Sequence, residues 1–145
     1  KCLISRELRL GSTSAHNADE RDDEEDWLKP CFPRLYFYDV LRGLNHIVRW
    51  ADLLNRRLPA SAIFRVVEHF CHQYPDGRIQ PKRRYDEVNT RSLDSSGQWI
   101  KGGPASHFLL QERVSKLDHA SPFLTAKWQE AVRTIDRLIE KDLIV

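Results

Sequence analysis

The sequence predicts an all-α fold in which amphipathic helices form hairpins. Three segments, 36–54, 61–74 and 121–141, place apolar residues at the 3.6-residue period of a helix. In the first segment the apolar face consists of Phe37, Val40, Leu41, Leu44 and Val48. Pro59 should lie beyond the end of this helix, because proline cannot continue the backbone hydrogen-bond ladder.

The other two helices have recognisable starts. Ser61 can cap the helix of residues 61–74 with its hydroxyl group. Ser121 offers the same cap to the helix of residues 121–141, and Pro122 suits its first helical position. The first two helices are joined by a short link and should form a hairpin. Because a lone hairpin leaves one apolar face uncovered, further helices are expected to pack against it.

The segments before and between the helices are polar. Residues 2–10 look like the end of a helix that Gly11 stops. Residues 11–30 are predicted to form an acidic loop, since every residue from Asp19 to Asp26 except Arg21 is acidic and like charges repel. A divalent cation site is the alternative, but the glycine-bearing spacing of a calcium loop is missing.

A turn at residues 74–78, with the sequence YPDGR, leads into a polar excursion over residues 79–103. The cluster Lys82 to Arg84 beside Tyr85 could contact nucleic acid. A cluster this short is typical of a solvated loop, so no nucleic-acid partner is predicted. The conformation of residues 104–117 stays open, and Phe108 to Val114 favours an extended piece over a short helix.

Several short motifs follow one another in a defined order: Leu8 to Ser14, Phe32-Pro33, Tyr38 to Leu44, Ile63 to Tyr74, Asp76 to Ile79 and Ser121 to Leu138. This order resembles an uncharacterised bacterial branch of the prenyltransferase and squalene-cyclase superfamily. The resemblance implies an α/α toroid, a closed ring of helical hairpins. Such a ring needs roughly twice the length of this chain, which begins at Lys1 and contains no methionine.

We therefore expect residues 1–145 to form a single helical domain or a piece of a larger toroid. The inner faces of an incomplete ring lack neighbours, so an apolar surface should be covered by the missing remainder, a second copy or another chain.

Composition narrows the class of protein. The net charge of +2, 41% hydrophobic and 30% charged residues are ordinary for a soluble domain, and no apolar run approaches the roughly 20 residues that span a bilayer. Three cysteines, an odd number, argue against a disulfide framework and favour a reducing compartment. A cytoplasmic protein without a membrane span is expected.

Asp39, Arg42 and Tyr38 are the candidates for ligand binding or for bracing the fold. Asp39 and Arg42 lie three residues apart, where an ion pair is allowed on one helix face. Near a helix start, Asp39 would also interact favourably with the helix dipole, so a structural brace is the favoured interpretation. No residue is predicted to be catalytic, because the sequence has no acidic cyclase motif and no marked nucleophile.

His69, Cys71 and His72 are weak candidates for metal ligands. Protein prenyltransferases, which belong to the resembled superfamily, bind zinc through an Asp, a Cys and a His. Here His69 and His72 lie one turn apart, but no Asp-x-Cys pattern precedes an aromatic helix. A free cysteine is commonly a small buried hydrophobe, so no metal and no cofactor are predicted.

Two functional hypotheses follow. The first is a non-catalytic segment of a helical toroid that binds an apolar ligand or a protein partner. The alternative is an isoprenoid-processing enzyme, a prenyltransferase or terpenoid cyclase, whose catalytic residues lie outside this chain.

Overall fold

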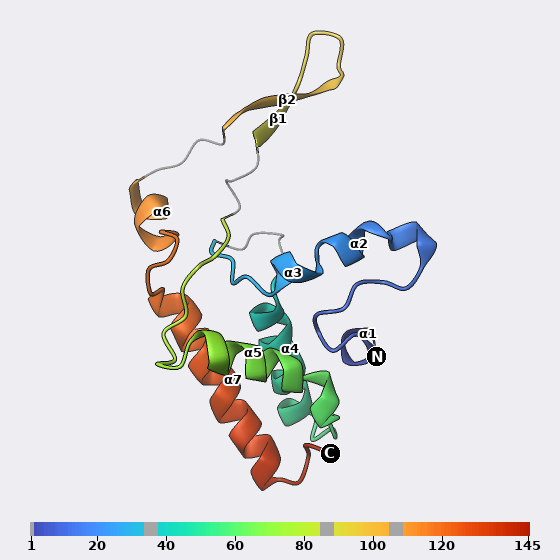
Figure 1. Ribbon diagram of the computed structural model, residues 1–145, viewed down its shortest axis with the longest axis vertical. Helices are drawn as coiled ribbons and strands as arrows, with labels where there is room; N and C mark the ends of the chain where they lie inside the picture. The colour runs from blue at the N-terminus through green and yellow to red at the C-terminus, as the bar shows by residue number, and fades with distance from the viewer. Residues whose placement is uncertain (1, 34–37, 85–88, 105–108) are drawn as a thin grey trace.

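The computed structural model describes residues 2–33, 38–84, 89–104 and 109–145, with the side chains at 19, 20, 89–92, 101, 103 and 104 left out. Three helices form its body: α4 (Val40–Leu53), α5 (Phe64–Gln73) and α7 (Pro122–Glu140). Figure 1 shows α7 and α4 running along the long axis of this body, with α5 crossing it. The described part is mostly helical, as the sequence predicted.

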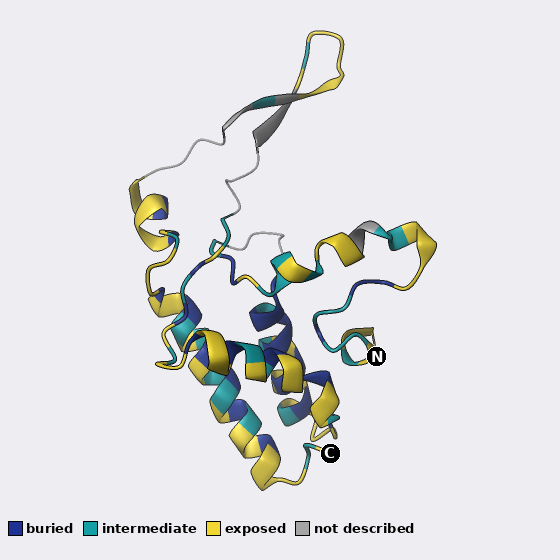
Figure 2. Cartoon of the chain, in the orientation of Figure 1, coloured by how far each residue is buried: buried dark blue, intermediate teal, exposed yellow. Residues whose placement is uncertain are grey.

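The core lies between these helices because each of them buries one apolar face (Figure 2). Phe70 of α5 stacks on Trp128 of α7, with ring centroids 5.2 Å apart. The largest apolar side chains that are fully buried are Phe70, Leu41, Leu44, Leu58, Ile79, Leu124 and Leu138. Residues predicted for the inner face of the first helix, from Val40 to Val48, therefore do line the core.

The helix boundaries differ from the predictions where capping decides them. Tyr36 and Phe37 lie outside the described residues, and Asp39 is extended (φ −138°, ψ 155°), so the first helix begins at Val40 and not at Tyr36. Ser61 was expected to cap the second helix. It instead lies in a 3-10 turn, Ala60–Ala62, and α5 begins after Ile63 with no side-chain cap. The predicted cap at Ser121 is present, because its hydroxyl accepts a hydrogen bond from the Leu124 amide.

The N-terminal region is less helical than predicted before Gly11 and more helical after it. Helix α1 spans Cys2–Ser5 and ends well before Gly11, because Glu7 and Leu8 adopt left-handed backbone angles (φ 49° and 62°) that a helix cannot contain. Residues 11–30 were predicted as an acidic loop, yet they form a 3-10 turn, Ala15–Asn17, and two short helices, α2 (Asp19–Asp22) and α3 (Glu24–Trp27). The negative charges on α3 lie in its first turn, where the helix dipole favours them.

The polar excursion of residues 79–103 contains a β-hairpin that the sequence analysis did not predict. Strands β1 (Asn89–Leu93) and β2 (Trp99–Pro104) pair antiparallel, with Leu93 opposite Trp99. In Figure 1 the hairpin stands away from the helices. Asp94 builds its turn by accepting hydrogen bonds from the Ser96 and Gln98 amides at 2.8 and 2.9 Å.

The segment that was expected to be extended forms a short helix, α6 (Leu109–Val114); Phe108 itself lies outside the described residues. The Gln111 side chain is buried, and the Gln111 backbone carbonyl accepts a hydrogen bond from the Ser115 hydroxyl at 2.6 Å. Leu109 and Leu110, by contrast, are exposed. None of the described helices combines the length and the hydrophobicity needed to cross a bilayer.

Candidate functional site

Asp39 joins two parts of the chain. It is fully buried at the start of α4, where one carboxylate oxygen accepts the amide hydrogen of Arg42 at 2.8 Å. The other oxygen accepts the amide hydrogen of Cys31 at 3.1 Å. A carboxylate at this position satisfies helix amides that have no intrahelical partner, so Asp39 fixes the start of α4 against the segment that carries Phe32.

Arg42 is half-buried in the first turn of α4, and the bond that connects it to Asp39 runs through its backbone amide. The sequence analysis had allowed a side-chain ion pair between the two. The structure shows that the carboxylate of Asp39 uses both of its oxygens on backbone amides.

Tyr38 is half-buried and lies against the N-terminal segment. Its hydroxyl donates a hydrogen bond to the Leu8 carbonyl at 2.7 Å, and its ring meets Trp27 edge-on at 5.6 Å. Burial, followed by the negative charge of Asp39, raises the pKa of the Tyr38 hydroxyl well above its usual value. A Cβ atom at Gly43 would clash with this phenol, so the close packing requires glycine there.

The metal candidates are on α5 and do not converge. Cys71 and His72 are exposed, whereas His69 is half-buried beside Phe70. Burial is the main cause that lowers the pKa of His69; a hydrogen bond to the Leu28 backbone opposes it and the charge of His72 adds to it. Within the described residues, no three His, Cys, Asp or Glu side chains are grouped closely enough to hold a metal ion. All three cysteines are free thiols.

A cavity lies where α6 leads into α7, and its volume is about 360 Å³. We call it the α6–α7 pocket. Its described lining residues are Phe32, Arg113, Val114, Lys116, His119, Ala120, Ser121, Pro122 and Phe123. The volume falls within the range of about 300 to 1,000 Å³ that is typical of small-molecule sites.

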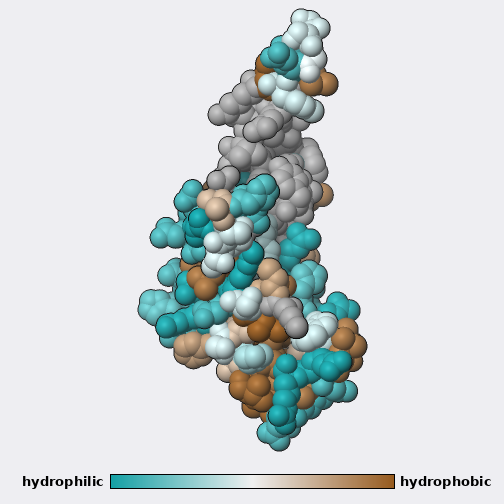
Figure 3. Space-filling view, turned by 90° about the vertical axis from the view of Figure 1, so that its right-hand side faces the viewer, coloured by the Kyte–Doolittle hydropathy of each residue, from teal (hydrophilic) through white to brown (hydrophobic). Residues whose placement is uncertain are grey.

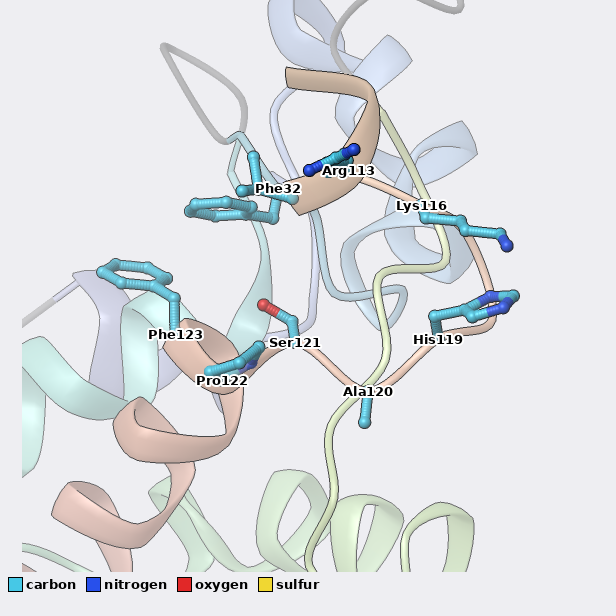
Figure 4. A pocket seen from close by; sticks show the side chains of 9 residues that line it. Phe32, Arg113, Lys116, His119, Ala120, Ser121, Pro122 and Phe123 are labelled. Atoms are coloured by element: carbon cyan, nitrogen blue, oxygen red, sulfur yellow. The ribbon is translucent and has the colours of Figure 1, made fainter. Parts of the chain in front are cut away.

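Two phenylalanines form the apolar side of the α6–α7 pocket. The rings of Phe32 and Phe123 are 4.8 Å apart and tilted by 32°. Figure 4 shows these rings on one side of the pocket, with Lys116 and His119 on the other and Ser121 between them. Ser121 is buried and is held by its bond to the Leu124 amide, so this edge of the pocket is the rigid start of a long helix.

The sequence shows Phe32-Pro33 as part of a motif and Ser121-Pro122 as a helix start, but it does not show that the two lie together. No local signal could have shown this, because the segments are distant in the sequence and are brought together by the packing of the helices. Arg113 and Lys116 had drawn no attention, since isolated basic residues are common on surfaces.

A second, smaller pocket of about 210 Å³ lies under α1. It is lined by Cys2, Leu3, Arg6, Leu8, Leu10, Trp27 and Tyr38. The predicted candidate Tyr38 therefore faces this pocket, whereas Asp39 and Arg42 are not among the residues that line either cavity.

Comparisons of the chain with protein-family models, with characterised proteins and with solved structures found no match. The resemblance to prenyltransferases and squalene cyclases therefore stays a prediction.

Proposed function

We propose that this chain is a non-catalytic helical module that binds an apolar ligand in the α6–α7 pocket, as a segment of a prenyltransferase-like or squalene-cyclase-like toroid. The pocket itself carries the proposal. It has the volume of a ligand site, and five of its described lining residues are apolar: Phe32, Val114, Ala120, Pro122 and Phe123.

The hydrogen bonds that anchor two of the lining segments support the same proposal. Asp39 ties the segment before Phe32 to α4, and Ser121 caps α7 just before Phe123. Both rings are therefore presented by anchored backbone. A preformed apolar surface loses little conformational entropy when a ligand binds. More of the free energy gained by burying apolar surface therefore contributes to the affinity.

Titration with N-phenyl-1-naphthylamine, an uncharged dye that fluoresces in apolar sites, tests the proposal. We expect saturable binding to the wild type. Phe123→Ala should weaken binding about three- to tenfold, because burial of part of an aromatic ring is worth on the order of 1 kcal/mol. Phe64→Ala is the matched control, since Phe64 is an exposed phenylalanine on α5 that does not line the pocket.

Equal affinity of the wild type and Phe123→Ala would show that the dye does not use this pocket and would reject the proposal. The alternative function, an isoprenoid-processing enzyme, requires catalytic residues beyond these 145. It would be favoured if a longer form of the protein converted an isoprenoid substrate to product.

A further inference from the structure

The α6–α7 pocket has a basic side as well as an apolar one. Arg113 belongs to the last turn of α6, and Lys116 and His119 belong to the connection between α6 and α7. All three line the pocket, and no acidic side chain is among its described lining residues. Arg113 and Lys116 therefore bring two positive charges to the lining of a pocket that also contains the rings of Phe32 and Phe123.

The acidic residues nearest in the sequence are not among the described lining residues of the pocket. Asp118 forms an ion pair with Lys82 at 2.5 Å, and neither residue lines the pocket. Glu112 precedes Arg113 on α6 and is also not part of the lining. The charged side chains among the described lining residues of the α6–α7 pocket are consequently all basic.

The start of α7 adds to this field. Helix α7 has 19 residues and begins at Pro122, so the partial positive charge of its dipole is at the pocket. This contribution is small by itself, but it has the same sign as the charges of Arg113 and Lys116. The lining thus combines the two phenylalanine rings with basic side chains: Figure 4 shows Arg113 beside Phe32, and Lys116 across the pocket from the rings.

We infer that the ligand of the α6–α7 pocket is an amphiphilic anion, with an apolar body against Phe32 and Phe123 and an acidic head group toward Arg113 and Lys116. This inference rests on the proposed function and adds the charge of the ligand to it. A carboxylate, a sulfonate or a phosphate has the required chemistry, since each accepts charge-assisted hydrogen bonds from guanidinium and ammonium groups.

Two dyes with the same ring skeleton separate the two claims. 1-Anilinonaphthalene-8-sulfonate differs from N-phenyl-1-naphthylamine by its sulfonate group. We expect the sulfonate to bind several-fold more tightly than the uncharged dye at low ionic strength. The difference should shrink in about 0.5 M salt, where the screening length falls to a few ångströms.

Arg113→Gln and Lys116→Gln test the head-group contact. Each should weaken binding of the sulfonate by up to about fivefold, the scale of an exposed charge pair, and leave the uncharged dye unaffected. Arg57→Gln is the matched control, because Arg57 is an exposed arginine in the link between α4 and α5. Displacement of the bound sulfonate by decanol, decanoate and decyl phosphate then distinguishes the head groups.

Each outcome decides between the claims. If the uncharged dye binds in a Phe123-dependent way but the sulfonate binds no more tightly, the inference is overturned and the proposed function stands. A tighter sulfonate whose affinity ignores both glutamine variants also overturns the inference, as does displacement by decanol that equals displacement by the two anions. If neither dye depends on Phe123, the proposed function fails, and the inference fails with it.

Discussion

Asp39 shows how much a single buried side chain can organise. A buried carboxylate is costly unless hydrogen bonds compensate for the lost hydration. Asp39 accepts hydrogen bonds from the Arg42 amide and from the Cys31 amide, and these bonds join the start of α4 to the segment that carries Phe32. Phe32 is also held by a hydrogen bond from its own amide to the Arg83 carbonyl, so residues outside the α6–α7 pocket contribute to its shape.

Replacing Asp39 with asparagine should lower the free energy of unfolding by about 1–2 kcal/mol. The amide oxygen of asparagine can still cap α4, but its NH₂ group would face the Cys31 amide, and two donors cannot bond to each other. Chemical denaturation monitored by circular dichroism measures the change. Asp136→Asn, at an exposed position of α7, is the control with the same loss of charge.

The same variants separate a brace from a ligand site. If Asp39 is a structural brace, Asp39→Asn should have a lower free energy of unfolding than the wild type. It should still bind N-phenyl-1-naphthylamine with nearly unchanged affinity under conditions where it is folded. Loss of binding at wild-type stability would instead assign Asp39 to a ligand site.

The raised pKa of Tyr74 predicts how the free energy of unfolding depends on pH in the alkaline range. Burial, followed by the charge of Asp118, raises the pKa of Tyr74 from 10.0 to about 12. Because the pKa is higher in the folded state, the stabilisation is complete below pH 10 and is lost as the pH rises through about 12. Tyr38 is shifted in the same direction and adds to the effect.

Tyr74→Phe should therefore lose less stability than the wild type between pH 10 and about 12. At neutral pH the two should differ by less than about 1 kcal/mol, since the hydroxyl makes one long bond of 3.4 Å to the Gln80 carbonyl. Urea unfolding at a series of pH values measures both. Parallel curves for the two proteins would contradict the assignment of this pH dependence to Tyr74.

Among the elements, the long helices could be predicted and the short ones could not. Helices α4 and α7 carry apolar faces over several turns, and Ser121-Pro122 marks the start of α7, so the sequence pattern alone located both. Helix α6 has six residues, too few for a period to stand out. Strand β1, with the sequence NTRSL, lacks the apolar alternation of a strand that packs on a core.

The sequence signals of the hairpin lie in its turn and not in its strands, and for this reason the hairpin was not predicted. Asp94 and Gly97 are the turn signals, and Gly97 takes the positive φ of 79° that glycine accepts readily. Leu93 and Trp99 beside the turn are exposed, so this pair of the described side chains is not packed in a core. The α6–α7 pocket was missed for a different reason, since its parts meet only in the folded chain.

Asp94→Ala should unfold the hairpin without unfolding the helices. The change removes the oxygen that accepts hydrogen bonds from Ser96 and Gln98, and an isolated two-stranded hairpin is marginally stable at best. Amide hydrogen exchange near Trp99 should become faster, while the thermal midpoint of the helical signal should move by less than about 2 °C, since the helical core is untouched. A cooperative loss of helical signal would show that the hairpin stabilises the helices.

Acid should have the same local effect as this substitution. The hydrogen bond from the Ser96 side chain, then that from the Gln98 backbone, lowers the pKa of Asp94. A carboxylate with a lowered pKa contributes its stabilisation above its usual pKa of 3.8 and loses it as the pH falls further.

On the scale of the whole molecule, contacts at one end join α4 to α7 and to the C-terminal segment. Asp52 on α4 binds Arg137 at 3.0 Å and Lys141 at 2.8 Å. The Leu58 amide and carbonyl then bond to Leu143 and Val145, so the link after α4 lies along the last residues. These contacts fix α4 against α7, but they do not establish a toroid, which stays a prediction from the resemblance.

At this same end, the last turn of α4 and its C-cap residue expose apolar side chains. We define the α4 stripe as Trp50 and Leu53 of α4 and the C-cap residue Leu54, which are 40%, 69% and 57% exposed. Figure 3 shows hydrophobic side chains gathered at the lower end of the molecule. Exposed apolar clusters of this kind are typical of surfaces that meet another protein.

We therefore expect the α4 stripe to be covered by a second copy, which makes the mean mass depend on concentration. Sedimentation velocity at increasing concentrations should show reversible association of the wild type. Leu53→Glu should weaken this association at least about tenfold, because dimerisation would bury a carboxylate on each chain without a partner. Leu93→Glu is the control, since Leu93 is 57% exposed on the hairpin, and the variant should associate like the wild type. A monomer at every concentration would reject the second copy and leave another chain as the expected partner of the stripe.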